Sequence, residues 1–317
     1  MPAPRDTSQV VRAARLYYEQ GCSQAEVAQA LGLSRSNVSR ILTQARERGI
    51  VEITIHDPEG PPLRDSSLEA ALRSTFSLRD VQVVHAPRTS GLEAVSRAGA
   101  ALLDTLAPTV SSIGVSWGHT VRSVVEQMQP RRLRPAPRVL PLVGGHSSLD
   151  EDESGESVLR VLASRLGARP EMLYAPAVLE SATAARTLRQ ESSIGDVLDA
   201  AAEVELALVG MGSMGHHSSP HVVRLMRLSA EEEAAFTAQH PVGDVCGRFV
   251  DGSGVPLGSP TQERVLAVTF SQLLRIPHVL GIASGPEKAP GVAGVLRSGA
   301  IHTLVVDDDL ARALLAL

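Results

Sequence analysis

Four polar side chains with the chemistry to read DNA bases cluster within one short segment. Arg35 and Arg40 can each pair with guanine. Asn37 can pair with adenine, and Ser36 can bond to a base or a phosphate. All four fall in the first turns of a predicted helix, the part of a recognition helix that reaches base edges in the major groove. We therefore predict a DNA-reading helix, with Gln24 of the preceding helix as a further contact.

The surrounding pattern is typical of a helix-turn-helix. Ser23 is suited to cap a helix, with Glu26 three residues later as its capping-box partner. Gly21 ends the helix before it, Gly32 supplies the turn, and Ser34 caps the DNA-reading helix. The residues predicted to face the small core recur at helical spacing and are Val11, Ala14, Leu16, Tyr17, Val38, Ile41 and Leu42.

A plain helical hairpin packed in a core would show a similar apolar pattern. The short second helix, the glycine turn and the polar outer face favour DNA binding instead. A strand predicted over Val51–Ile55 would add a wing to the module. Residues 1–60 hold as many Asp and Glu as Arg, so positive charge is confined to a local stripe. We expect one copy to bind DNA weakly and dimerisation to be required.

Further along the chain, short apolar runs alternate with helical patterns. The predicted strands are Val81–His85, Ser112–Ser116, Arg138–Val143, Leu206–Val209, His278–Ala283 and His302–Val306. The predicted helices are Leu92–Leu106, Val121–Met128, Glu156–Leu166, Ile194–Ala202, Thr261–Leu274 and Ala289–Arg297. Buried strands alternating with helices predict an α/β fold, Rossmann-like, with a mostly parallel sheet covered on both faces.

Length and composition fit two domains. The 317 residues leave room for a large domain beside the small one, and the net charge of −5 argues against a non-specific nucleic-acid coat. A stretch rich in Pro, Gly and polar residues follows the predicted wing. We predict a DNA-binding domain over 1–58, a linker over 59–66, and an effector-binding and oligomerisation domain over 67–317.

Loops directly after strands are the candidate ligand sites, because open α/β sheets bind small molecules at the carboxyl ends of their strands. Gly118 and Thr120 follow the second predicted strand and open a helix, where unbonded amides favour an anion such as phosphate. Gly144 and Gly145 follow the third strand and would let backbone approach a ligand, with Ser147 adding a hydroxyl. Taken alone, each loop is also compatible with an ordinary turn.

Two further residues are candidates for ligand contacts. Lys288 is the only lysine of the chain and follows the fifth predicted strand, at the start of a helix. A compact ammonium retained in a sequence that otherwise uses Arg favours an anion-binding role. Asp244 offers an acceptor for sugar hydroxyls. A surface lysine kept by chance and a simple turn carboxylate are the alternative interpretations.

Two familiar patterns are discounted. Gly210–Gly215 matches the dinucleotide motif G-x-G-x-x-G, but no helix is predicted directly after it and no strand ending in an acidic residue follows about 20 positions on. His216, His217 and His221 resemble a metal cluster but lack a nearby Cys or carboxylate. We predict no cofactor, no metal site and no catalytic residues.

The sequence gives no sign of a membrane protein or an exported one. No apolar run approaches the roughly 18 residues of a membrane span, and the N-terminus lacks the apolar region of a signal peptide. The two cysteines, Cys22 and Cys246, fit a reducing compartment. The cytoplasm is the expected location.

Taken together and in order, several segments resemble the SorC family of sugar-binding transcriptional regulators, related to DeoR-like regulators. They are the helix-turn-helix segment, GVSWGHT, LPLVGG, YAPAVLES, GDVCGRFVDGSG and GIASGPEKAPGVAGVLRSGAIHTLVVDD. The resemblance implies an effector domain similar to the sugar-phosphate isomerase and deaminase fold. It also implies a dimer or tetramer on a palindromic operator in double-stranded DNA, controlled by a phosphorylated sugar.

The same resemblance suggests roles for individual residues. It puts the phosphate near Gly118, Thr120 and Lys288, with a sugar hydroxyl held by Asp244. The Gly144 loop would flank the ligand. His119 belongs to the same set, although relatives often carry Arg at this position, which leaves its role open.

Two other classes of protein remain as alternatives. One is a sugar-phosphate isomerase or deaminase with an appended DNA-binding module, in which Asp244 and a histidine such as His119 would be an acid–base pair. The other is an architectural DNA-binding protein whose large domain serves only assembly. Turnover of sugar phosphates would indicate the enzyme. Absence of any small-molecule effect on stability would indicate the architectural protein.

Overall fold

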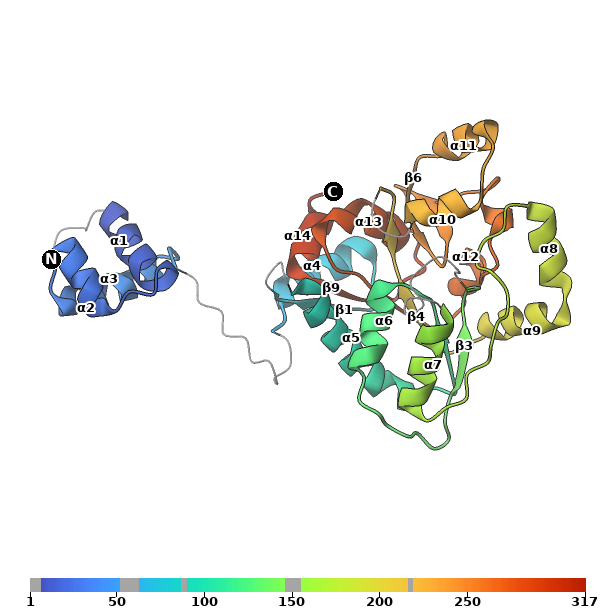
Figure 1. The fold of residues 1–317 in the computed structure, drawn as a ribbon, viewed down its shortest axis with the longest axis horizontal. Coiled ribbons are helices and arrows are strands. Elements are labelled where there is room, and N and C mark those ends of the chain that lie inside the picture. Colours follow the sequence, from blue (N-terminus) through green and yellow to red (C-terminus); the bar gives the residue numbers. More distant parts are fainter. Residues whose placement is uncertain (1–6, 52–62, 87–89, 146–154, 216–218) are drawn as a thin grey trace. The chain divides into compact units, whose positions relative to one another are not determined.

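A computed structural model of the protein describes residues 7–51, 63–86, 90–145, 155–215 and 219–317. The chain divides into two compact units, Met1–Gly60 and Pro61–Leu317. Figure 1 shows a helical first unit and an α/β arrangement in the second. None of the described helices is long and apolar enough to cross a membrane.

The first unit is the predicted helix-turn-helix. It contains α1 (Thr7–Ala14), extended by a π-helical turn at Arg15–Glu19, then α2 (Gln24–Leu31) and α3 (Arg35–Glu47). Ser23 and Glu26 form the expected capping box on α2, and the Ser34 hydroxyl accepts from the Asn37 amide at the start of α3. Gly32 has φ +64°, in the left-handed region that favours glycine at the end of a helix.

The predicted core of this unit is corrected at its first helix. Val38, Ile41 and Leu42 are buried as expected, but Val10 and Ala13 are buried in place of Val11, which is only partly covered. The buried residues of α1 therefore start one position earlier than the predicted stripe, because the apolar face runs through positions 10, 13 and 14. The predicted wing strand lies outside the described residues, except for Val51.

The second unit is built on a six-stranded parallel sheet with the order β1-β9-β8-β4-β2-β3. Its strands are β1 (Asp80–Val84), β2 (Ser112–Val115), β3 (Arg138–Pro141), β4 (Leu206–Gly210), β8 (His278–Ile282) and β9 (Thr303–Asp307). Each of the six matches a predicted strand, and no strand end differs from its predicted position by more than two residues. The prediction of a mostly parallel sheet is confirmed.

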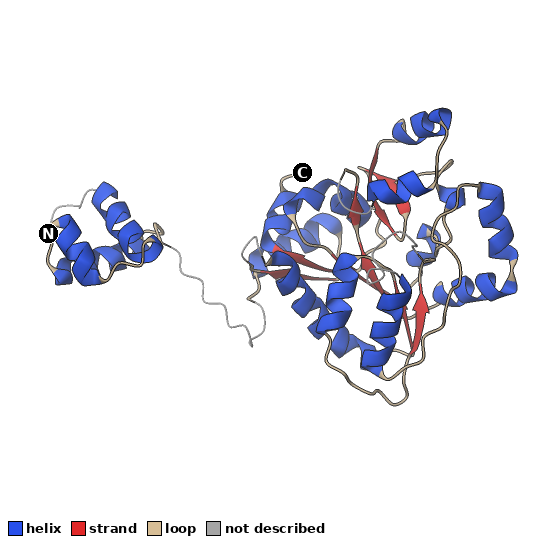
Figure 2. Ribbon diagram, in the orientation of Figure 1, coloured by secondary structure: helices blue, strands red, loops and turns tan. Residues whose placement is uncertain are grey.

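Helices cover both faces of this sheet (Figure 2). Apolar residues of α5 (Gly91–Leu106), α6 (His119–Gln127) and α7 (Gly155–Leu166) share one core. Those of α4 (Ser66–Phe76), α13 (Ala289–Arg297) and α14 (Asp308–Leu315) share the other. The helix after β2 thus covers one face and the helix after β8 covers the opposite face. Connections that diverge in this way open a crevice at the carboxyl ends of the strands.

A second, antiparallel sheet was not predicted. It has the order β5-β6-β7 and consists of β5 (Gly212–Ser213), β6 (Pro241–Val245) and β7 (Arg248–Asp251). The remaining helices are α8 (Ala182–Gln190), α9 (Ser192–Ala201), α10 (Ser219–Leu225), α11 (Ala230–Thr237) and α12 (Phe270–Leu273). Strands as short as β5 carry no periodic signal, which explains why the sequence pattern missed this sheet.

Two predicted boundaries are wrong. The helix expected over Thr261–Leu274 is only a short turn at Gln262–Arg264 followed by α12, and the apolar run between them is extended, with bridges from Val265 to Val178 and from Ala267 to Val143. A short apolar run does not distinguish a strand from a helix.

The predicted linker over 59–66 is also too long at its C-terminal end. Arg64 pairs with Val84 of β1, and its guanidinium bonds to Glu69 at 2.6 and 2.9 Å. Asp65 caps α4 by accepting two backbone amides. These contacts tie residues 64–66 to the α/β unit. The earlier part of the predicted linker lies outside the described residues.

Candidate functional site

The outer surface of α3 carries the side chains predicted to contact DNA. Arg35, Ser36 and Arg40 are exposed, and Asn37 is partly buried. The Arg40 guanidinium donates to the Asn37 side-chain oxygen at 2.8 Å, so these two residues present one joint hydrogen-bonding group. Gln24 is the partly buried first residue of α2. The arrangement provides donors and acceptors at the N-terminal turns of an exposed helix, as base recognition requires.

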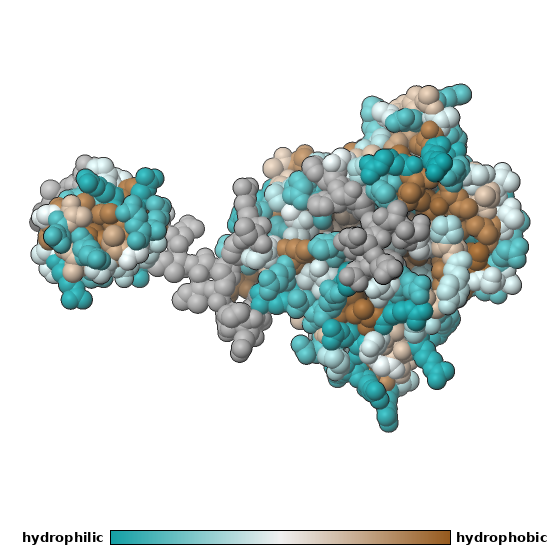
Figure 3. All heavy atoms as spheres, in the orientation of Figure 1, coloured by the Kyte–Doolittle hydropathy of each residue, from teal (hydrophilic) through white to brown (hydrophobic). Residues whose placement is uncertain are grey.

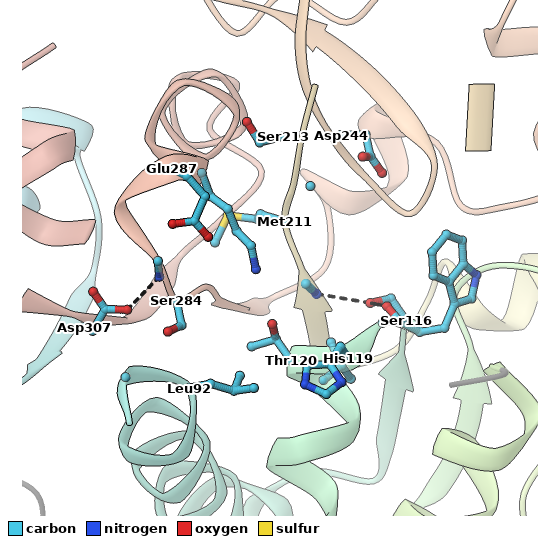
Figure 4. A pocket seen from close by; sticks show the side chains of 18 of the residues that line it. Leu92, Ser116, His119, Thr120, Met211, Ser213, Asp244, Ser284, Glu287 and Asp307 are labelled. Atoms are coloured by element: carbon cyan, nitrogen blue, oxygen red, sulfur yellow. Dashed lines mark hydrogen bonds between the residues drawn. The ribbon is translucent and has the colours of Figure 1, made fainter. Parts of the chain in front are cut away.

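The α/β unit contains a cavity of about 1010 Å³ at the carboxyl ends of β2, β4, β8 and β9 (Figure 4). Five predicted ligand residues from three distant parts of the chain line it, namely Gly118, His119, Thr120, Asp244 and Lys288. A cavity of this size accommodates a small polar metabolite. Five of the eight predicted ligand residues thus lie together at the carboxyl ends of the strands, where such folds bind ligands.

The start of α6 forms one wall of the cavity. Gly118 precedes the helix with φ +124°, a backbone conformation that side-chain-bearing residues rarely adopt. The first turn of a helix has no intrahelical acceptors for its amides, and here that turn contains His119 and the buried Thr120. The Ser116 hydroxyl accepts the Gly210 amide at 3.2 Å and joins the end of β2 to β4. This wall suits an anion.

The loop that carries Lys288 forms a second wall and is held by Asp307. One Asp307 oxygen accepts the Gly285 amide at 2.8 Å, and the other caps α14 by accepting the Leu310 amide at 2.7 Å. The side-chain amine of Lys288 forms no hydrogen bond or ion pair with any residue in the described part of the chain. Burial lowers the pKa of its amine, although the charges of Glu287 and Asp307 act in the opposite direction. The amine is thus a largely desolvated cation available to a ligand.

Asp244 lies at the other side of the cavity in Figure 4, and each of its carboxylate oxygens accepts one hydrogen bond from a neighbouring donor. The Ser219 hydroxyl donates to one carboxylate oxygen at 2.5 Å, and the Gly247 amide donates to the other at 3.1 Å. Burial raises the pKa of this carboxyl, while these two hydrogen bonds lower it in part. Each oxygen retains acceptor capacity, which suits a sugar hydroxyl.

Gly144 and Gly145 do not line the cavity. A side chain at Gly144 would place Cβ 2.5 Å from the Pro176 carbonyl oxygen, and the Gly145 amide donates to Ala175 at 2.8 Å. These glycines therefore permit close packing of the 175–177 segment, rather than approach of a ligand. Gly144 acts on the site only through Trp117, whose indole donates to its carbonyl at 3.0 Å. Ser147 lies outside the described residues.

The discounted glycine motif turns out to line the cavity. Gly210, Met211, Gly212 and Ser213 run along it from β4 into β5. A Cβ atom on Gly212 would lie 2.1 Å from an Asp244 oxygen. The glycine run itself was the available signal, since closely spaced glycines after a strand allow close approach of other groups.

The other lining residues were not predicted as ligand contacts. Most are polar, and they include Ser116, His221, Arg224, Cys246, Gly247, Ser284, Glu287, Asp307 and Asp309. His216 and His217 lie outside the described residues, and His221 belongs to α10. Within the described ranges, no group of His, Cys, Asp and Glu side chains is suited to a metal ion.

Comparisons with known proteins cover both units. Residues 61–316 match the family model described as "Putative sugar-binding domain", and residues 8–48 match that of sigma-70 region 4. The chain is 31% identical over 314 residues to the sorbitol operon regulator of Klebsiella pneumoniae, covering 98% of both chains. It is 29% identical over 310 residues to the deoxyribonucleoside regulator of Bacillus subtilis, covering 96% of both.

Solved structures agree. The crystal structure of the full-length sorbitol operon regulator SorC from Klebsiella pneumoniae superposes with a TM-score of 0.72, covering 98% of this chain and 100% of that one. A helix-turn-helix joined to a matched sugar-binding domain, with similarity along the full length, shows that the chain belongs to the SorC family of sugar-binding transcriptional regulators.

Proposed function

We propose that this regulator controls a carbohydrate-related operon and that a phosphorylated sugar controls its operator binding. The observation that carries the proposal is the cavity, which combines the start of α6, the Lys288 amine and the Asp244 carboxylate. The first two suit a phosphate, and the third suits a sugar hydroxyl. The names of the relatives, regulators of sorbitol and deoxyribonucleoside genes, support a carbohydrate ligand.

Control would operate through the arrangement of subunits. A palindromic operator requires two recognition helices spaced by about 34 Å or a multiple of that distance. Exposed apolar surface supports a homo-oligomer: Figure 3 shows such surface between α8 and α10, and Tyr174 is 77% exposed. A ligand that binds one arrangement of effector domains more tightly than another shifts the spacing, typically with a coupling of about 1–3 kcal/mol.

We also propose that the cavity binds its ligand without turnover. In the enzyme alternative, Asp244 would exchange protons with a histidine such as His119. Its hydrogen bonds among the described residues come instead from Ser219 and Gly247. Incubation with a panel of sugar phosphates, followed by product analysis, tests this point.

The test of the proposed function is a thermal-shift screen of the full chain against phosphorylated sugars and their unphosphorylated counterparts. A ligand at a hundredfold excess over its dissociation constant stabilises the native state by about 2.7 kcal/mol, which is readily measured. Shifts only with phosphorylated sugars, together with a changed affinity for operator DNA, are expected. Absence of any shift across the panel would reject the effector part of the proposal and leave DNA binding intact.

Replacing Arg40 by Ala should weaken operator binding by about 1–3 kcal/mol and relax the base preference, because one base contact is lost. The change also removes the hydrogen bond that orients Asn37. Fluorescence anisotropy with the operator and with single-base variants measures both effects. Arg12, exposed on α1, provides an Arg→Ala control that should retain the preference. Unchanged affinity and selectivity in the Arg40 variant would exclude it from base recognition.

Affinity for the phosphorylated ligand should fall as pH rises through the lowered pKa of Lys288. Only the protonated amine attracts an anion, so the loss begins at a lower pH than an ordinary lysine would give. Calorimetric titrations at increasing pH measure the effect. In Lys288→Arg the fall should disappear, because a guanidinium stays charged throughout that range. A pH-independent affinity in the unmodified protein would contradict the prediction.

A further inference from the structure

We propose that the effector carries a second anionic group, a phosphate or a carboxylate, which binds Arg224 on α10 at the Asp244 side of the cavity. This inference rests on the proposed function and narrows the ligand class to sugars with two separated negative groups. Arg224 belongs to none of the loops that follow the strands of the parallel sheet in the sequence analysis. It is nevertheless a cavity-lining residue.

The position of α10 fixes the side of the cavity on which Arg224 lies. Ser219, the first residue of α10, is buried and donates to Asp244 at 2.5 Å. A Cβ atom on Gly247 would lie 3.9 Å from a methyl group of Val222, in the middle of α10. The helix therefore packs over the turn that joins β6 to β7, and His221 and Arg224, three residues apart, share a face of it that borders the cavity.

Arg224 is held in place by a group that does not neutralise it. Its guanidinium lies 3.1 Å from His221 Nδ1. Because a guanidinium only donates, this nitrogen acts as the acceptor of the hydrogen bond. No carboxylate in the described part of the chain forms an ion pair with Arg224. The pair thus presents an oriented positive charge that can bond to an oxyanion.

The two cationic residues that line the cavity belong to different elements, Lys288 to the loop after β8 and Arg224 to α10. In Figure 4, Ser284, Glu287 and Asp307 of the Lys288 wall lie on one side, and Asp244 lies on the other. With a volume of about 1010 Å³, the cavity exceeds what a single phosphate group needs. A phosphate at Lys288 and the start of α6 would leave the sugar hydroxyls at Asp244 and the far end of the sugar beside Arg224.

The carboxylates of the cavity are compatible with this arrangement. Asp307 uses both oxygens to hold backbone amides, and Asp309 lies 3.8 Å from Arg312. Both belong to the Lys288 side. Asp244 is the acidic residue next to α10, and its charge is partly offset by the donors from Ser219 and Gly247. Arg224 is the arginine that lines the cavity on that side.

Paired ligands test the proposal in the full chain. Calorimetry compares glucose 6-phosphate with 6-phosphogluconate, and fructose 6-phosphate with fructose 1,6-bisphosphate, extended to matched pentose pairs. The first pair tests a carboxylate and the second a second phosphate. We expect the doubly anionic member of at least one pair to bind tenfold or more tightly than its partner, and this advantage to fall below twofold in Arg224→Gln.

Arg227→Gln is the matched control, because Arg227 is exposed, pairs with Glu180 at 3.0 Å and does not line the cavity. It should keep the tenfold preference. Equal thermal midpoints of the variants without ligand would show that both remain folded. Equal affinity for both members of every pair, or a preference that survives in Arg224→Gln, would overturn this inference while leaving a phosphorylated effector in place. Absence of binding by every phosphorylated sugar would overturn the proposed function itself.

Discussion

Replacing Lys288 by Ala is expected to weaken binding of the phosphorylated effector by roughly 100- to 1,000-fold, equivalent to about 3–4 kcal/mol. The amine is the cavity's one lysine, and it is largely desolvated. Without this amine, the ligand phosphate would lie in a poorly hydrated part of the cavity, and only the start of α6 would stabilise the phosphate. Calorimetric titration with the ligand found in the thermal-shift screen measures the loss directly.

The Lys288 variant should keep its fold and its operator binding in the absence of ligand. The side-chain amine of Lys288 makes no hydrogen bond or ion pair within the described residues, so its removal breaks no polar contact there. Lys288→Arg provides the comparison, because it retains the charge but changes its geometry. A wild-type response of Lys288→Ala to the ligand, with the same change in operator affinity at the same ligand concentration, would show that the phosphate binds elsewhere.

Replacing Gly243 by Ala should destabilise the α/β unit by about 3 kcal/mol, at the upper end of the usual cost of overpacking. A Cβ atom there would lie 2.5 Å from the Gly291 Cα atom and 2.6 Å from the Gly212 carbonyl oxygen. Both neighbours are backbone, so neither can move aside by changing a rotamer. The packing of α13 against β5 and β6 would have to open. Asp244 of the cavity directly follows Gly243 in the chain.

Gly258→Ala is the matched control for Gly243→Ala. Gly258 has no heavy atom within 4 Å of a built Cβ and no left-handed φ. Urea denaturation of both variants, monitored by circular dichroism, gives their free energies of unfolding. A stability of Gly243→Ala equal to that of Gly258→Ala would mean that α13 and β6 are less tightly packed than the structure shows.

Local signals in the sequence were enough to predict the elements that position the site. Ser23 and Ser34 cap helices through side chains that bond to amides three residues away, so their effect is visible in a short window. The six strands are four or five residues long, mostly apolar, and lie between helical patterns. Loops after such strands contain Gly118, Thr120 and Lys288, and the general rule for parallel sheets was sufficient to select them.

The sequence by itself thus determined the helix-turn-helix, the parallel sheet and the anion-favouring wall of the cavity. Tertiary structure alone decided the rest of the site. In sequence, Gly144 is indistinguishable from a ligand-binding glycine, and only the packing of Pro176 against it shows otherwise. Gly212 is a lining residue because it lies against Asp244. Arg224 reaches the cavity because Ser219 bonds to Asp244, 25 positions away. Contacts between residues distant in sequence depend on packing, and no local periodicity records them.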